Sequence, residues 1–326
     1  MGKPSGDADA RHLASAPLPS ADLAPAGFTP DRWWLDLRAR PLALWGVLLV
    51  ASGLVHAGIW AITGGPWEGP VTWRKPILFG ISGGLTSLST GWAWSRLPPW
   101  RLDPFLARSA TLALVVEVAL IDLQCWRGVA SHFNRTTRLD SLLYDAMGLL
   151  ILWVTAVIVM ITVRFFRQPV SLPTAMLLAV RAGLVYLVIS CLLGIWVGIN
   201  GDLRVQQGLP PEQFGQAGVP KFPHGVVIHA LQWLPLLAWA TTRADFSAGT
   251  RLRLVSLASR ATGLLLVYAL AATLLGYPRF QAPPQLLALF AVAVIGLGVT
   301  FMIAALGLAR RLMQDGFSPP PPEPPI

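Results

Sequence analysis

Long apolar runs dominate this chain and limit what it can fold into. Eight runs approach or exceed the roughly 20 residues that a helix needs to cross the hydrocarbon core of a bilayer. Only 13% of the residues are charged and 54% are hydrophobic, which leaves too little polar surface to cover a soluble protein of this size. The sequence therefore predicts an all-α polytopic integral membrane helical bundle of about eight transmembrane helices. The runs cover residues 41–63, 76–95, 106–127, 143–163, 175–199, 225–241, 255–276 and 284–308.

The basic residues lie mostly between these runs and predict the orientation of the chain in the membrane. With a cytoplasmic N-terminus, the Lys and Arg residues divide about two to one in favour of the cytoplasmic side, as the positive-inside rule requires. We therefore expect both termini in the cytoplasm and a multi-pass protein of the cell membrane, with the lipid bilayer as its first partner. The net charge of +9 does not indicate a nucleic-acid partner, because nucleic-acid-binding domains gather their basic residues on one soluble face.

Two segments flank the predicted bundle of residues 41–309. Residues 1–40 are rich in Pro, Ala, Ser and Asp and lack the pattern of a cleavable signal peptide, so we expect a disordered cytoplasmic tail. Residues 310–326 end in a proline run that cannot continue a helix, which predicts a second cytoplasmic tail. Within the bundle, residues 200–224 are rich in Gly, Pro and Gln and predict an irregular outer loop.

The third span carries ionisable residues at a depth where they are rare. A charged side chain at mid-span costs about 2.5 to 3.5 kcal/mol on insertion scales, so such a residue indicates a functional site. Glu117 lies near the middle of the span and Asp122 lies nearer the outer end. At about 100° per residue, Glu117, Gln124 and Arg127 share a face, whereas Asp122 points about 140° away from Glu117. The structural alternative is that these groups satisfy one another and hold the helices together.

Histidines and other polar residues gather toward the same outer side. Four of the five histidines fall there, which predicts a shared site for spans one, three and six. The candidate metal ligands are His56, His132, His224 and His229. The candidate catalytic residues are Glu117, Asp122, Arg127, His132 and His229. The candidate substrate-binding residues are Arg74, Lys75, Gln124, Asn134, His224 and Gln232.

These patterns leave three classes of function open. The first is a membrane-embedded enzyme that acts on a lipid or small molecule, with or without zinc. Ser52 and His56, an intramembrane Asp and a late histidine pair resemble features of the seven-helix membrane hydrolase superfamily of alkaline ceramidases and adiponectin-receptor relatives. That family ends in a His-x-x-x-His pair, whereas His224 and His229 are five residues apart and two spans follow them, so its zinc ligands are not transferred here.

The second class is a haem or quinone redox protein, since histidines on two helices can ligate haem iron. Eight spans with outer histidines are similar to haem A synthase in outline, but the last two spans contain no histidine. The third class is a transporter or small-molecule binding protein in which Glu117 lines a path. The sequence leaves the substrate, the cofactor and the oligomeric state open.

Two pairs of small residues, one of glycines and one of cysteines, allow further predictions. Gly80 and Gly84 have the small-xxx-small spacing of closely packed membrane helices. Cys125 and Cys191 are the only cysteines, and we expect two small buried side chains, with a single disulfide as the alternative.

Overall fold

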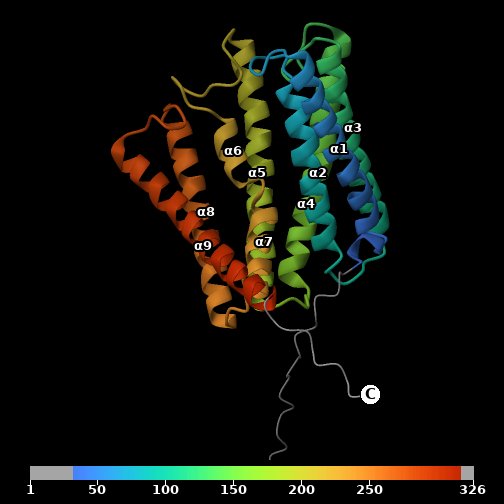
Figure 1. Ribbon diagram of the computed structural model, residues 1–326. Helices are drawn as coiled ribbons and strands as arrows, with labels where there is room; N and C mark the ends of the chain where they lie inside the picture. Colours follow the sequence, from blue (N-terminus) through green and yellow to red (C-terminus); the bar gives the residue numbers. More distant parts are fainter. Residues whose placement is uncertain (1–31, 317–326) are drawn as a thin grey trace, which may run out of the picture. The chain divides into compact units, whose positions relative to one another are not determined.

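The helices follow the apolar runs closely. The structure, a computed structural model, describes residues 32–316, and within this range every long regular element is a helix (Figure 1). A 3₁₀ turn, η1 (Trp33–Leu35), comes first. The helices that follow in the described range are α1 (Ala39–Thr63), α2 (Arg74–Trp94), α3 (Asp103–Trp126), α4 (Arg138–Arg167), α5 (Thr174–Gln206), α6 (Lys221–Val227), α7 (Ala230–Arg243), α8 (Ala248–Leu274) and α9 (Pro284–Gly316).

The predicted all-α polytopic membrane bundle is confirmed. Within the described residues, seven helical segments are long and apolar enough to cross a bilayer, with α6 and α7 together forming one of them, Lys221–Arg243. α2 is less apolar, because serine, threonine and glycine interrupt its run, but it packs along α1 through the bundle (Figure 1). With α2 included, the described chain runs through the bundle eight times.

The helices pack as two groups. α1 to α4 contact one another, and α5 to α9 contact one another, while the two groups meet where α4 packs on α5 and α2 packs on α7 (Figure 1). The α2–α7 contact brings α2 of the first group against the interrupted span formed by α6 and α7.

Glycines set the closest helix contact. A Cβ atom on Gly84 would lie 2.5 Å from the Gly46 carbonyl oxygen, and one on Gly80 would lie 2.8 Å from the Gly53 Cα. The backbones of α1 and α2 therefore touch at two glycine pairs, which confirms the packing role predicted for Gly80 and Gly84 and adds their partners on α1.

Three boundaries differ from the sequence expectation. Most of the predicted tail 1–40 lies outside the described residues, but its last part forms η1 and the start of α1. α5 continues to Gln206, which shortens the predicted loop 200–224 to residues 207–220. α9 continues to Gly316, past the predicted helix end at 308, and residues 317–326 are outside the described range.

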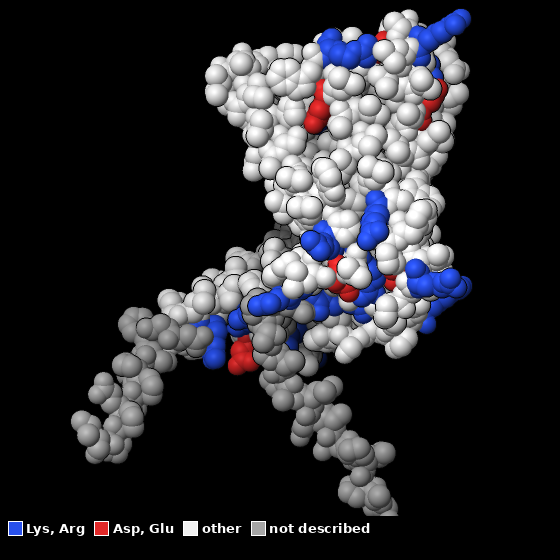
Figure 2. All heavy atoms as spheres, turned by 90° about the vertical axis from the view of Figure 1, so that its right-hand side faces the viewer, with Lys and Arg blue, Asp and Glu red and all other residues white. Residues whose placement is uncertain are grey.

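The two ends of the bundle have different loops. We call the end with loops 64–73, 127–137, 207–220 and 275–283 the long-loop end, and the end with loops 95–102, 168–173 and 244–247 the arginine-rich end. Figure 2 shows charged side chains in bands at the two ends, with a wide uncharged zone between them. This zone is the part of the surface that suits hydrocarbon. The prediction that the long-loop end faces outward remains a prediction.

Candidate functional site

A break in the sixth span provides the first component of the candidate site. α6 ends at Val227 and α7 begins at Ala230, while His229 has φ of −97° and ψ of 11°, outside the helical range. The backbone N–H groups of Gln232 and Trp233 both donate to the His229 carbonyl, at 3.0 and 3.2 Å, and start α7 anew. Irregular backbone at membrane depth occurs where it is buried in protein or lines a cavity.

The break is tied to α2 through a histidine. His229 Nε2 lies 3.2 Å from the Ser82 hydroxyl of α2. From this contact, α2 and α7 both run toward the arginine-rich end (Figure 1). The residues one turn after Ser82 on α2 and one turn after His229 on α7 are therefore at similar depths in the bundle. The groups found there are Thr86 on α2 and Gln232 and Trp233 on α7.

These deeper groups are enclosed but have no hydrogen-bond partner among the described residues. The Thr86 hydroxyl, the Trp233 indole nitrogen and both amide atoms of Gln232 are in this state by distance and angle, although the Gln232 amide lies beside the His229 ring. Leaving a buried polar group unpaired costs about 1 to 3 kcal/mol, so such groups in one place indicate a bound molecule or water. The substrate-binding role predicted for Gln232 is consistent with this position.

Glu117 faces the same region of the bundle. The bare backbone of Gly83 on α2 lies opposite Leu114 and Val118 of α3, so Ser82 and Glu117 are at about the same depth. Gln124, seven residues on and on the same face as Glu117, contacts Asp140 of α4. Glu117 is therefore buried on the face of α3 that leads to Gln124, at about the depth of Ser82.

No cation pairs with Glu117 and no group donates a hydrogen bond to it, among the described residues. It is only 4% exposed. We define Ser82, Thr86, Glu117, His229 and Gln232, which lie at similar depths on α2, α3 and the interrupted span, as the central polar cluster.

A second group of polar residues lies on the other side of α3. The Ser52 hydroxyl donates to Asp122 Oδ2 at 3.3 Å, and His56 Nδ1 lies 2.9 Å from the Ser52 carbonyl. The Trp126 indole N–H donates to His56 Nε2 at 3.0 Å. Both ring nitrogens of His56 are therefore engaged, and no lone pair is left for a metal. The other oxygen of Asp122, Oδ1, is buried without a partner among the described residues.

The histidines therefore divide between two places. His56 joins Asp122 on the α1 side of α3, as the 140° separation of Asp122 from Glu117 requires, and His229 joins the central polar cluster. The described residues contain no group of three His, Cys, Asp or Glu side chains that could hold a metal ion. The predicted convergence of spans one, three and six on one outer cavity, with a metal site from His56, His132, His224 and His229, is not the arrangement in the structure.

The remaining two histidines have local partners. His224 Nδ1 lies 2.8 Å from the Ser190 carbonyl of α5. His132, in the loop after α3, packs among the rings of Phe79, Phe133 and Tyr144. Burial, with Lys75 and Lys221 nearby, lowers the pKa of His132 to about 3, so it is neutral at physiological pH.

Several predicted site residues instead brace the long-loop end. Arg127 pairs with the buried Asp140 at 2.9 Å and also donates to Gln124. Gln124 itself donates to Asp140 at 3.1 Å. Asn134 donates to the Ala130 carbonyl and accepts from Thr136. This network joins the end of α3 to the start of α4, which is the structural alternative that the sequence left open for Gln124 and Arg127.

The residues before α2 have mixed roles. Lys75 donates to the Pro70 carbonyl at 3.0 Å, within the loop that leads into the helix. Arg74 lies beside it at the start of α2. Cys125 and Cys191 are both free thiols, so the disulfide alternative is wrong.

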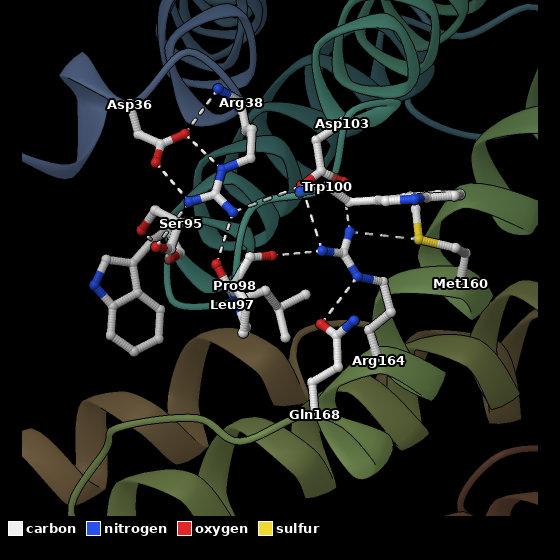
Figure 3. Close-up of polar contacts among 11 residues, drawn as sticks. Asp36, Arg38, Ser95, Leu97, Pro98, Trp100, Asp103, Met160, Arg164 and Gln168 are labelled. Carbon is white, nitrogen blue, oxygen red and sulfur yellow. Dashed lines mark hydrogen bonds and ion pairs between the residues drawn. The ribbon is translucent and has the colours of Figure 1, made fainter.

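The most buried ion cluster was not predicted from the sequence. At the arginine-rich end, Asp103 pairs with Arg164 and lies 3.6 Å from Arg38 (Figure 3). Arg38 also binds Asp36 and the Leu97 carbonyl, and Arg164 donates to the Pro98 carbonyl. We call Asp36, Arg38, Asp103 and Arg164 the arginine clasp. Because all its polar groups are engaged, it fastens α1, α3 and α4 together and presents no free group to a ligand.

Comparison with known proteins adds no relative. No protein-family model, curated protein or solved structure matches the chain.

Proposed function

We propose that this protein is a membrane transport protein that carries a small polar solute together with a proton. The solute binds at the break between α6 and α7, and Glu117 carries the proton. The observation that supports this most strongly is the break itself, because it places His229 and the unpaired Gln232 amide at the depth of the unpaired Glu117.

Interrupted membrane helices are a recurrent feature of secondary transporters. Their substrate and coupling-ion sites lie near the midplane, where the backbone of a discontinuous helix and the ends of its two halves are available. Here the break lies where α7 of one helix group contacts α2 of the other, beside the α4–α5 contact between the same groups. A site at such an interface changes its access when one group moves against the other.

Each residue of the central polar cluster has a chemical role in this proposal. Gln232 offers one acceptor and two donor hydrogens, and Thr86 offers a hydroxyl, which together fit a solute that both donates and accepts hydrogen bonds. Glu117 takes up a proton as its carboxylate becomes a carboxylic acid and releases it on the other side. A buried carboxylate without a cationic partner favours the neutral form, which suits transfer through a bundle in lipid.

The alternatives have less support. A zinc enzyme needs three protein ligands and an open position, and the described residues do not gather three. A haem scheme that uses His56 requires a free ring nitrogen, and both are hydrogen-bonded. The transport proposal uses the groups that the structure leaves unpaired.

The test is charge movement across reconstituted vesicles on a solid-supported membrane, with pools of small polar solutes. We expect at least one pool to drive a current in the wild type at an imposed pH gradient. Glu117→Gln keeps the shape and removes the ionisation, so it should abolish the proton-dependent current. Glu68→Gln, the same change at an exposed loop position, is the matched control and should leave the current intact.

Two results would contradict the proposal. The first is a Glu117→Gln variant that transports with an unchanged dependence on the pH gradient. The second is a wild type that moves no solute of any pool, while circular dichroism and gel filtration show it folded and monodisperse.

A further inference from the structure

A separate pocket opens at the arginine-rich end. It has a volume of about 430 Å³ and lies between the loop that joins α7 to α8 and the last turns of α9. Its polar wall includes Arg310, Arg311 and Gln314, and its apolar wall includes Ile303 and Leu306. None of these residues belongs to the central polar cluster.

Local backbone features shape this pocket. Asp245, with φ of 58°, ends α7 and turns the chain so that Phe246 points at α9. Phe246 then packs on the bare backbone of Gly307, where an added Cβ atom would lie 2.5 Å from its ring. The loop is thereby held against α9, and the pocket remains as the space beside this contact.

We propose that this pocket binds the headgroup of an anionic phospholipid. Arginine guanidinium groups match phosphate oxygens in paired hydrogen bonds, and the pocket wall contains two successive arginines, Arg310 and Arg311. The exposed side chains of Ile303 and Leu306 continue from the pocket along α9 and suit an acyl chain. Basic pockets between helices at the cytoplasmic end of membrane proteins hold such headgroups.

Asp245, the acidic residue of the pocket, limits the choice of headgroup further. Asp245 lines the same space and opposes part of the arginine charge. A headgroup that carries hydroxyls besides its phosphate would satisfy it, because a carboxylate accepts hydrogen bonds from hydroxyls. Phosphatidylglycerol has this chemistry, whereas the choline group of phosphatidylcholine has no hydroxyl to donate.

The experiment uses the full chain in phosphatidylcholine vesicles that contain a few per cent of phosphatidylglycerol with a photoreactive headgroup. After illumination, peptide mass spectrometry locates the labelled residues. We expect labels at residues 244–246 and 303–314, and competition by unmodified phosphatidylglycerol but not by phosphatidylcholine or inorganic phosphate. An arginine beside an anionic lipid contributes about a fivefold factor in affinity. The double variant Arg310→Gln/Arg311→Gln should therefore bind about 25-fold more weakly.

The matched control removes the same charge elsewhere. Arg167→Gln/Arg253→Gln changes two exposed arginines at the same end that do not line the pocket, and its pocket labelling should equal that of the wild type. The proposal is overturned if the pocket peptides carry no label or if phosphatidylcholine competes equally. It also fails if the pocket double variant labels as well as the control, or if inorganic phosphate competes fully, since the site would then take free phosphate.

Discussion

Replacing Asp103 by asparagine should be among the most destabilising polar substitutions in the bundle. The side chain of Asp103 is 1% exposed, and that of its partner Arg164 is 9% exposed. Asparagine keeps the shape and can still accept from the Trp100 N–H, which lies 2.9 Å from Asp103 Oδ2. It leaves Arg164 in a buried place without a counter-charge, with neutral acceptors that include the Pro98 carbonyl, Gln168 and the Met160 sulfur.

Removal of one partner of a buried ion pair costs about 3 to 5 kcal/mol. Arg38 keeps its ion pair with Asp36, so it is little affected when Asp103 is neutralised. The expected destabilisation for Asp103→Asn is therefore at the lower end of this range, about 3 kcal/mol. Arg164→Met in the same chain removes the unpaired cation. The double variant should therefore be more stable than the sum of the two single effects predicts, by about 2 kcal/mol.

The assay is reversible unfolding in mixed micelles at increasing SDS fraction, followed by tryptophan fluorescence. Arg167→Met is the control, since it changes an exposed arginine three residues later on α4, and we expect it within about 0.5 kcal/mol of the wild type. A folded Asp103→Asn protein within about 1 kcal/mol of the wild type would show that the Asp103–Arg164 pair does not stabilise the bundle, as would additive single effects in the double variant.

Three other predictions concern packing and charge, each measured in the same unfolding assay. Gly84→Ala should destabilise by about 1 to 3 kcal/mol through contact with the Gly46 carbonyl, whereas Gly148→Ala, which meets open space, should be neutral or stabilising; equal effects would contradict the α1–α2 contact. Asp140→Asn should destabilise the protein by unpairing Arg127, and by more than Asp145→Asn, at a more exposed pair, which should cost under about 1 kcal/mol. Burial lowers the pKa of His132 to about 3, so near pH 6 this imidazole takes up a proton only in the unfolded chain. The free energy of unfolding should therefore fall as the pH drops below about 6.5. His132→Phe should remove that part of the pH dependence, and an unchanged profile would count against a buried neutral His132.

Much of the fold could be predicted because membrane crossing depends on the length and polarity of each run. The apolar runs gave the spans, and the Gly80–Gly84 spacing indicated close packing, since both depend on local sequence. The break at His229 could not be seen in this way. Hydropathy continues through it, and Pro235, the visible helix disruptor, lies within α7.

The candidate site was predicted in part, because sequence gives the depth of a residue more readily than its direction around a bundle. Glu117 stood out at mid-span, but its relation to His229 depends on how α2 packs against both α3 and α7. Four histidines were expected to share one site, yet His56 contacts Ser52 and Trp126, whereas His229 contacts Ser82 of α2. The buried positions of Arg38 and Arg164 could not be predicted, since nothing local distinguishes a buried basic residue at a helix end from one exposed to water or lipid.

The most direct test of the central claim is an infrared pH titration of the reconstituted protein, because protonated carboxylic acids have a carbonyl band that carboxylates lack. We expect a carboxylic acid band in the wild type that responds to pH and to the transported solute, disappears in Glu117→Gln and persists in Glu68→Gln. A spectrum in which Glu117→Gln and the wild type have the same carboxylic acid bands at every pH would contradict the assignment of Glu117 as the proton carrier.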